Sequence, residues 1–249
     1  MTNLHIKFPS VWPGWNMPEC TLTSVPQSET YSLPSSSSPR HKYDDEPKVV
    51  SVTVDPKVHT DYCSDSPVFR GFIQDDPDDE RPYRNHNHTF VRHAPPRLSS
   101  SDSSSSEDDA GPATTVALKF AMRDDFIADL VEEAQVYAGP LATLQGRTVP
   151  RCYGLFVAEN EDGQTIACLV LEHWGEVIRK PFRQLPIETR IRVLERLGEI
   201  HRQGLVHGDF AERNVLQNTN GDIRIIDFDQ AVYDHDCKGE GARSGAVWV

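Results

Sequence analysis

Apolar residues recur at helical spacing in two stretches of the second half of the chain. Over residues 186–202 they line one side of an amphipathic helix, and Gly204 stands where a helix C-terminal glycine belongs. Over residues 126–137 a similar period ends at Gly139. The apolar positions are Ile187, Ile191, Leu194, Leu197 and Ile200 in the longer stretch, and Phe126, Ile127, Leu130, Val131, Ala134 and Tyr137 in the shorter one. The pattern therefore predicts two helices with one buried face each.

Shorter apolar runs predict strands between and before these helices. They lie at residues 49–54, 68–73, 114–121 and 166–171. Residues 215–226 contain two further short runs joined by an Asn-Gly turn, which is the strongest local signal for a hairpin. A hairpin of this length folds the chain back, so we expect Asp227 to return to the neighbourhood of Asn214.

Composition divides the chain into unequal parts. The hydrophobic content is 37% and the net charge is −13, and much of this bias lies in the first 110 residues. We expect residues 1–46 to form a disordered Ser/Pro-rich tail, because they offer little apolar surface to offset chain entropy. Residues 75–113 are predicted to be a low-complexity acidic insert. The acidity argues against nucleic acid or an anionic membrane as the primary partner.

The cysteines and the N-terminal residues indicate the cellular compartment. The five cysteines are scattered and show no C-x-x-C spacing, which is typical of ordinary intracellular thiols rather than of disulfides or a zinc site. No stretch approaches the length of a membrane span, and the first residues lack the apolar run of a signal peptide. We therefore expect a cytoplasmic or nuclear protein.

Residues that can carry chemistry gather between positions 207 and 229. Asp209 precedes Asn214 by a short interval, and the predicted hairpin brings Asp227 back to them. Hard oxygen ligands of this kind suit Mg²⁺, which proteins hold through one or two side chains together with nucleotide phosphates. Asp209 would then face the nucleophile rather than the metal. The arrangement predicts a phosphoryl-transfer site.

These sequences resemble the catalytic and metal-binding loops of the protein-kinase-like superfamily. The H-G-D sequence at 207–209 and the I-D-F-D sequence at 226–229 are most similar to RIO-type atypical kinases and to small-molecule kinases of the aminoglycoside and choline type. The resemblance implies that Asp209 orients or deprotonates the acceptor hydroxyl. It also implies that Asn214 and Asp227 hold Mg²⁺.

Upstream residues extend the resemblance towards an ATP site. Lys119 lies in a strand similar to the V-A-I-K strand of kinases, where the lysine neutralises nucleotide phosphates. Glu133 resembles the helix glutamate that pairs with this lysine, and Glu132 is the alternative, because the helical phase does not decide between them. Glu172 ends the strand at 166–171, and the resemblance implies that it marks the hinge that binds adenine.

Several positions depart from the kinase pattern. No glycine occurs over residues 55–67, where a phosphate-binding loop would need one for close backbone approach. Gly208 replaces the arginine that couples to a phosphorylated activation loop, so we do not expect that form of control. Arg213 is similar to the position that supplies phosphate-stabilising charge in many tyrosine kinases. Asp229 replaces the glycine of D-F-G and is implied as an additional metal ligand.

The sequence after Asp227 is short for this family. It contains no A-P-E segment and no later helices, so we expect part of the helix at 186–202 to be exposed. Either a truncated gene product or a protein partner that covers this face would explain the pattern.

The resulting expectation is an α+β, two-lobed protein-kinase-like fold, with an upper lobe at 47–178 and a partial lower lobe at 179–249. The leading function is ATP- and Mg²⁺-dependent transfer of phosphate to a protein Ser/Thr hydroxyl. The alternatives are a small-molecule kinase, which would act on another hydroxyl acceptor, and a catalytically dead pseudokinase that acts as a binding module. The missing glycine loop favours the pseudokinase, whereas the intact set of Lys119, Asp209, Asn214 and Asp227 favours the enzyme.

Overall fold

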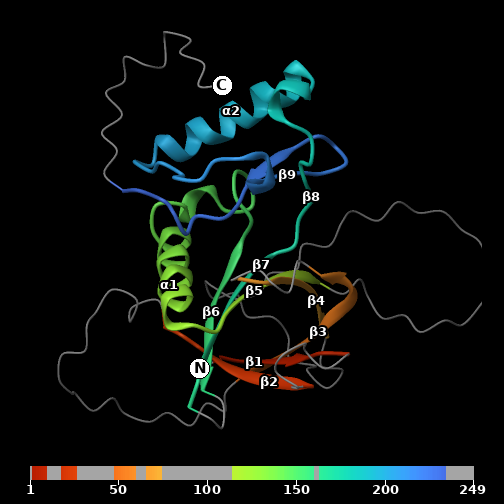
Figure 1. Cartoon of the computed structure of the whole chain (residues 1–249), viewed down its shortest axis with the longest axis vertical. Helices are drawn as coiled ribbons and strands as arrows, with labels where there is room; N and C mark the ends of the chain where they lie inside the picture. The colour runs from red at the N-terminus through yellow and green to blue at the C-terminus, as the bar shows by residue number, and fades with distance from the viewer. Residues whose placement is uncertain are drawn as a thin grey trace, which may run out of the picture.

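The computed structural model describes residues 2–9, 18–26, 48–59, 66–74, 114–159 and 163–233. The expectations for the acidic insert at 75–113 and for residues 234–249 lie outside these ranges. Within them the chain mixes strands with α-helices, which confirms the α+β class (Figure 1).

Seven of the described strands close into a barrel in the order β1-β2-β6-β7-β5-β4-β3. All neighbours are antiparallel except β1 and β3, which run parallel. The strands are β1 (Thr2–Lys7), β2 (Glu19–Ser24), β3 (Lys48–His59), β4 (Val68–Gln74), β5 (Thr115–Ala121), β6 (Cys152–Glu159) and β7 (Thr165–Glu172). Those predicted at 49–54, 68–73, 114–121 and 166–171 are confirmed as β3, β4, β5 and β7.

The expectation of a disordered tail over residues 1–46 is wrong for residues 2–9 and 18–26. Strand β1 pairs with β2 and β3, and β2 also pairs with β6. The two strands alternate, so that Leu4, Ile6 and Leu22 are fully buried in the barrel. A strand of six alternating residues can form when other strands pair with it on both sides. In a Ser/Pro-rich sequence, so short an alternation does not stand out.

The barrel interior is a packed apolar core. Phe8, Phe69 and Phe120 meet at its centre, with ring centroids 5.8–6.3 Å apart and tilted or edge-on geometries. Such aromatic pairs add to the stabilisation from buried area. The residues of β4 and β5 that alternate with this core, including Lys119, therefore face outward.

Helix α1 (Asp124–Ala138) packs against the outside of β5, β6 and β7 (Figure 1). It buries Leu130, Ala134 and Tyr137 in a second core, as the sequence period predicts. The same core includes Ile200 and Phe228 from the last part of the chain, so it joins the barrel to the segments that follow it.

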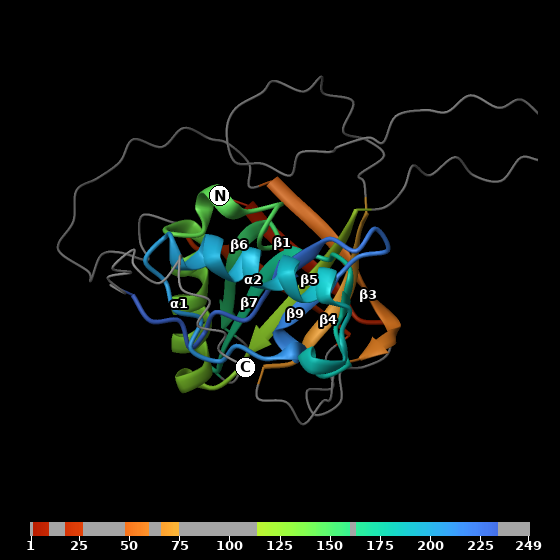
Figure 2. The ribbon, with the colours of Figure 1, turned by 90° about the horizontal axis from the view of Figure 1, so that it is seen from above.

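Helix α2 (Ile187–His201) lies at the end of the molecule opposite β1 and β2 (Figure 1), so it crosses in front of the barrel in the view from above (Figure 2). Beneath it is a sheet in the order β10-β9-β8, made of β8 (Glu176–Val177), β9 (Val215–Gln217) and β10 (Ile223–Ile225). Strands β9 and β10 form the predicted hairpin, since they pair antiparallel. Ile187, Ile191 and Leu194 on α2 are 48–53% exposed, as we expected for part of this helix.

Candidate functional site

Lys119 is the centre of the candidate site. Its Nζ lies 2.7 Å from Oε2 of Glu133 on α1 and 2.6 Å from Oδ1 of Asp227, which follows β10. The lysine side chain is 11% exposed and that of Glu133 is 1% exposed. Glu132, the alternative partner, is exposed. The structure therefore selects Glu133 and brings together three residues predicted to act on a nucleotide.

The charged groups in this cluster shift the pKa values of one another. Burial alone would lower the pKa of Lys119, but the carboxylates of Glu133 and Asp227 outweigh it and the pKa is raised. Burial raises the pKa of Glu133, although the Lys119 ammonium opposes that rise. Lys119 thus stays cationic at neutral pH, in the state required for binding phosphate.

The segment containing Asp227 is held by its neighbours in a strained conformation. Asp227 has φ of +73°, in the left-handed region that non-glycine residues rarely adopt. The next residue, Phe228, is buried and donates its backbone N–H to Oε1 of Glu133 at 3.2 Å. Its ring packs edge-on against the ring of Tyr137. It also packs in a tilted arrangement against the ring of His207, with 4.9 Å between the centroids. Phe228 thus fixes the direction in which the Asp227 carboxylate points.

Residues 207–214, which we call the catalytic loop, are fastened to the same segment. A ring nitrogen of His207 lies 2.9 Å from the carbonyl oxygen of Ile226. The side-chain amide of Asn214 donates to the backbone carbonyl of Asp209 at 2.8 Å. The backbone carbonyl of Asn214 accepts from the backbone N–H of Ile226. His207 is therefore a support for the loop.

Gly208 is required by the backbone of this loop. Its φ is +80°, and a Cβ atom at this position would clash with the carbonyl oxygen of Gln230. Only glycine accepts both conditions without strain. The absence of an arginine at this position therefore has a steric cause in the chain that follows Asp229.

Asp209 carries an ion pair that the sequence did not predict. One guanidinium nitrogen of Arg213 donates to both carboxylate oxygens, at 2.7 and 2.6 Å. Asp209 remains 40% exposed, so an acceptor can approach it from solvent. The structure thus places both residues predicted to be catalytic in contact with each other.

The carboxylates offer oxygen ligands for a divalent cation. Asp229 lies 3.7 Å from Lys119 Nζ, so three carboxylates surround one ammonium. Burial and the neighbouring charge of Asp227 raise the pKa of Asp229. Within the described ranges, no group of three or more His, Cys, Asp or Glu is arranged to hold a metal alone. The cluster has more carboxylates than ammonium groups, which suits Mg²⁺. Mg²⁺ needs few protein ligands when phosphate oxygens complete its coordination shell.

Glu172 was predicted to mark the adenine hinge, and its carboxylate makes structural contacts. Oε2 lies 2.8 Å from Nη1 of Arg224 and accepts the backbone N–H of Arg151 at 3.1 Å. Arg224 in turn lies over the ring of Trp174, 4.2 Å from its centroid. This network ties the end of β7 to β10. Sequence reasoning missed Arg224, because an arginine in a short strand carries no local signal of its role.

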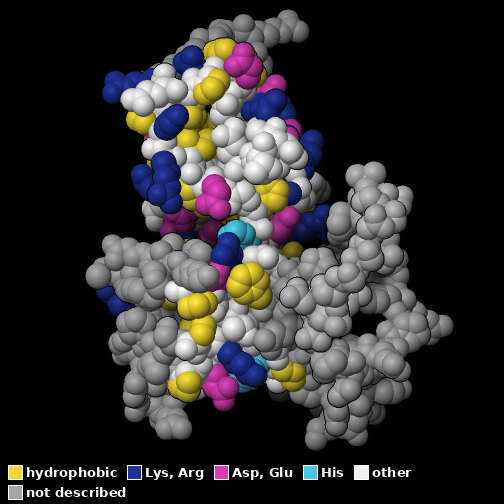
Figure 3. All heavy atoms as spheres, turned by 90° about the vertical axis from the view of Figure 1, so that its right-hand side faces the viewer, with side chains coloured by type: hydrophobic (Ala, Val, Ile, Leu, Met, Phe, Trp, Pro, Cys, Tyr) yellow, Lys and Arg dark blue, Asp and Glu magenta, His cyan; other side chains and the backbone are white. Residues whose placement is uncertain are grey.

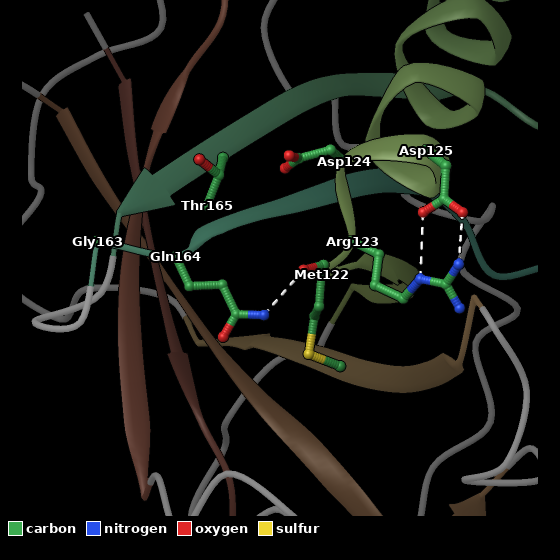
Figure 4. A pocket seen from close by; sticks show the side chains of 7 residues that line it. All are labelled: Met122, Arg123, Asp124, Asp125, Gly163, Gln164 and Thr165. Carbon is green, nitrogen blue, oxygen red and sulfur yellow. Dashed lines mark hydrogen bonds and ion pairs between the residues drawn. The ribbon is translucent and has the colours of Figure 1, made fainter.

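A hollow on the barrel surface contains none of these residues. It is lined by the start of α1 and by the β6–β7 turn (Figure 4). Gln164 donates to the carbonyl of Met122 there, and Arg123 pairs with Asp125 at 2.6 Å. These contacts stabilise the turn and the first turn of the helix. The hollow is therefore not the candidate site, because none of the predicted site residues line it.

Among the described residues, neither α-helix has the length and the apolar character that a membrane-spanning helix needs.

Comparison with known proteins agrees with this geometry. Residues 184–240 match the RIO domain family. A probable serine/threonine-protein kinase from Streptomyces coelicolor is 36% identical over 72 residues, which cover 29% of this chain and 10% of that protein. The match thus spans about a tenth of the length of that relative. Over the part of the chain that they cover, the RIO domain match and the kinase match both support an atypical protein-kinase-like superfamily.

Proposed function

We propose that the protein is an ATP- and Mg²⁺-dependent phosphotransferase that acts on Ser/Thr hydroxyls of proteins. The observation that supports this most is the contact of Lys119 with both Glu133 and Asp227, at 2.7 and 2.6 Å. These residues come from a strand, a helix and a loop. A buried ion pair adds little net stability, because desolvation of the charges offsets most of their attraction. A phosphate site, in contrast, would use one carboxylate to orient the lysine and the other to hold a metal.

Nucleotide binding requires the residues of the cluster in separate roles. Lys119, oriented by Glu133, neutralises phosphate oxygens as a point charge. Asp227 and Asn214 would hold Mg²⁺, and Asp229 would add a further oxygen ligand. Mg²⁺ supplies charge neutralisation at the transferring phosphoryl group.

In the proposed transfer step, Asp209 accepts the proton of the acceptor hydroxyl. The acceptor oxygen forms a bond to the γ-phosphorus while the bond from that phosphorus to the β–γ bridging oxygen breaks, and ADP leaves. The acceptor proton passes to the Asp209 carboxylate, which lies at an exposed edge of the catalytic loop. Arg213 faces the charge that develops on the transferring group.

We further propose that the described strands and helices form two lobes around this site. The upper lobe comprises the barrel and α1 within residues 47–178, with β1 and β2 added to it. The lower lobe comprises α2, β9, β10 and the catalytic loop within residues 179–249, with β8 (Glu176–Val177) added to it through its pairing with β9. The nucleotide then lies between the outward face of β5 and the loop carrying Asp227.

The first test is thermal denaturation of the full chain with ATP, with and without Mg²⁺. Ligand at about one hundred times its dissociation constant adds about 2.7 kcal/mol to stability. Asp227→Asn should remove the Mg²⁺-dependent increase. Asp222→Asn, the same change at an exposed carboxylate of the adjacent hairpin, should retain it. An increase that survives Asp227→Asn would contradict the proposed metal site.

A nucleotide-binding module without transfer is the second candidate. It is favoured by the absence of glycine over residues 55–67, which begin in the last part of β3 and end just before β4. The two candidates differ in a single-turnover assay with labelled ATP. Labelled phosphate on any hydroxyl supports the enzyme, and label only on small alcohols supports a small-molecule kinase. Mg²⁺-dependent binding without transfer supports the module.

A further inference from the structure

The ion pair between Arg213 and Asp209 limits what the acceptor can be. Both oxygens of the proposed base accept from one guanidinium nitrogen. The Arg213 side chain is 64% exposed, so this pair adds little net stability. A second anion that approaches the loop can therefore replace Asp209 at the guanidinium. An acceptor without negative charge would have to compete with Arg213 for the same oxygens.

The segment before α2 docks against the catalytic loop and adds positive charge beside it. The rings of Phe182 and Phe210 stack with centroids 5.4 Å apart and planes 11° apart. The N–H of Phe182 donates to Oε1 of Glu212 at 2.7 Å. These two contacts place the exposed side chains of Lys180 and Arg183 next to the loop.

The exposed cations of the two segments form a set that we call the basic rim. Its members are Arg179, Lys180, Arg183 and Arg213. Three acids of these segments, Glu176, Asp209 and Glu212, offset the charge of the four cations only in part, and the backbone hydrogen bond from Phe182 lowers the pKa of Glu212 and fixes its carboxylate. Lys and Arg side chains lie over the upper part of the face in Figure 3, where β8 and the start of α2 are found. In a chain of net charge −13 this is a local reversal of sign.

We infer that the acceptor is an acidic peptide segment, in which carboxylates or phosphates flank the Ser or Thr hydroxyl. The inference rests on the proposed phosphotransfer and names its substrate class. Complementary charge across an interface selects partners and speeds encounter. Here it has a second effect, because an acceptor carboxylate that pairs with Arg213 releases an oxygen of Asp209 for the hydroxyl proton. Binding of the correct acceptor and exposure of the base are then one event.

The test compares matched fluorescent peptides that differ only in whether Asp, Ala or Lys flanks a single serine. Anisotropy measures their binding to the full chain without nucleotide, and labelled ATP with Mg²⁺ measures transfer. We expect the acidic peptide to bind about tenfold more tightly than the alanine peptide, as a few exposed ion pairs allow. Raising the salt from about 0.1 M to about 1 M shortens the screening length from about 10 Å to about 3 Å and should abolish the preference.

Charge-reversal variants locate the effect. Lys180→Glu with Arg183→Glu should remove the preference for the acidic peptide. Lys7→Glu with Lys48→Glu makes the same charge change at exposed positions of the barrel and should leave the preference intact. Equal loss in both variants would show a general charge effect and overturn the inference.

The two readouts separate this inference from the proposed function. Transfer to all peptides with equal affinity would keep the phosphotransferase and overturn the acidic acceptor. Tighter binding of the acidic peptide without transfer to it would keep the basic rim as a recognition surface and contradict the enzyme. Preferential binding of a single-stranded RNA of equal charge would show a general polyanion site and overturn the peptide assignment.

Discussion

Replacing Lys119 by methionine tests the electrostatics of the cluster directly. The change keeps most of the apolar stem but leaves Glu133, whose side chain is 1% exposed, without its counter-charge. Removing one partner of a buried ion pair costs about 3–5 kcal/mol, because the remaining charge is buried and uncompensated. We expect a loss at the lower end of that range, since Glu133 still accepts the N–H of Phe228.

The loss should depend on pH in a definite direction. Burial raises the pKa of Glu133 above its ordinary value of 4.5 even with Lys119 present. A carboxyl with a higher pKa in the folded state contributes stability at low pH, and that contribution disappears as the pH rises through the folded pKa. Without Lys119 the pKa of Glu133 rises further, so Lys119→Met should lose more stability at pH 8 than at pH 5. Lys119 itself is charged throughout this window, because its pKa is raised from 10.5.

Urea denaturation at pH 5 and pH 8 measures both quantities. Lys48→Met, at an exposed position of β3, should change the free energy of unfolding by less than about 0.5 kcal/mol at either pH. The double variant Lys119→Met with Glu133→Gln should be more stable than Lys119→Met at pH 8, because no buried charge is left. Equal losses at both pH values, or a double variant no better than the single one, would refute this account.

Other changes test the catalytic loop and the barrel. Gly208→Ala should destabilise the protein by about 2 kcal/mol or more, because position 208 has positive φ and no room beside Gln230. Gly198→Ala, in open space on α2, should instead stabilise it by about 0.5–1 kcal/mol, and thermal denaturation distinguishes the two. Leu22→Ala should cost about 2–5 kcal/mol in urea denaturation, because Leu22 is fully buried in β2; no effect would contradict a barrel closed by the first strands.

The elements with sustained local periodicity could be predicted from the sequence. Helices α1 and α2 each run over about four turns, long enough for the 3.6-residue period to be recognised. The β9–β10 hairpin was indicated by its Asn-Gly turn. Glu133 lies on α1, and Asn214 and Asp227 flank the hairpin, which is why most of the candidate site could be named in advance.

The remaining features depend on contacts between distant parts of the chain. Strand β1 is recognisable only through its partners β2 and β3, which lie many residues away. The choice of Glu133 over Glu132 depends on how α1 rotates when it packs against the barrel, and adjacent helical positions differ too little in pattern to reveal that. The ion pair of Glu172 with Arg224 likewise joins strands β7 and β10, which no local period connects.

The backbone around Gly208 explains why no larger side chain fits before Asp209, and the ion pair of Asp209 shows which cation lies beside it instead. The backbone N–H of Val206 donates to the carbonyl of Val232 at 3.0 Å, and the N–H of Val232 donates to the carbonyl of Val206 at 2.8 Å. The chain after Asp229 therefore returns at once to the start of the catalytic loop. The Gln230 carbonyl then occupies the space that a side chain at position 208 would need. An arginine cannot stand there to bind a phosphorylated activation loop. The cation beside the proposed base is instead Arg213, which bonds to Asp209 itself. If the proposed transfer takes place, an anionic acceptor that pairs with Arg213 would free Asp209, so the binding of the acceptor would itself expose the base.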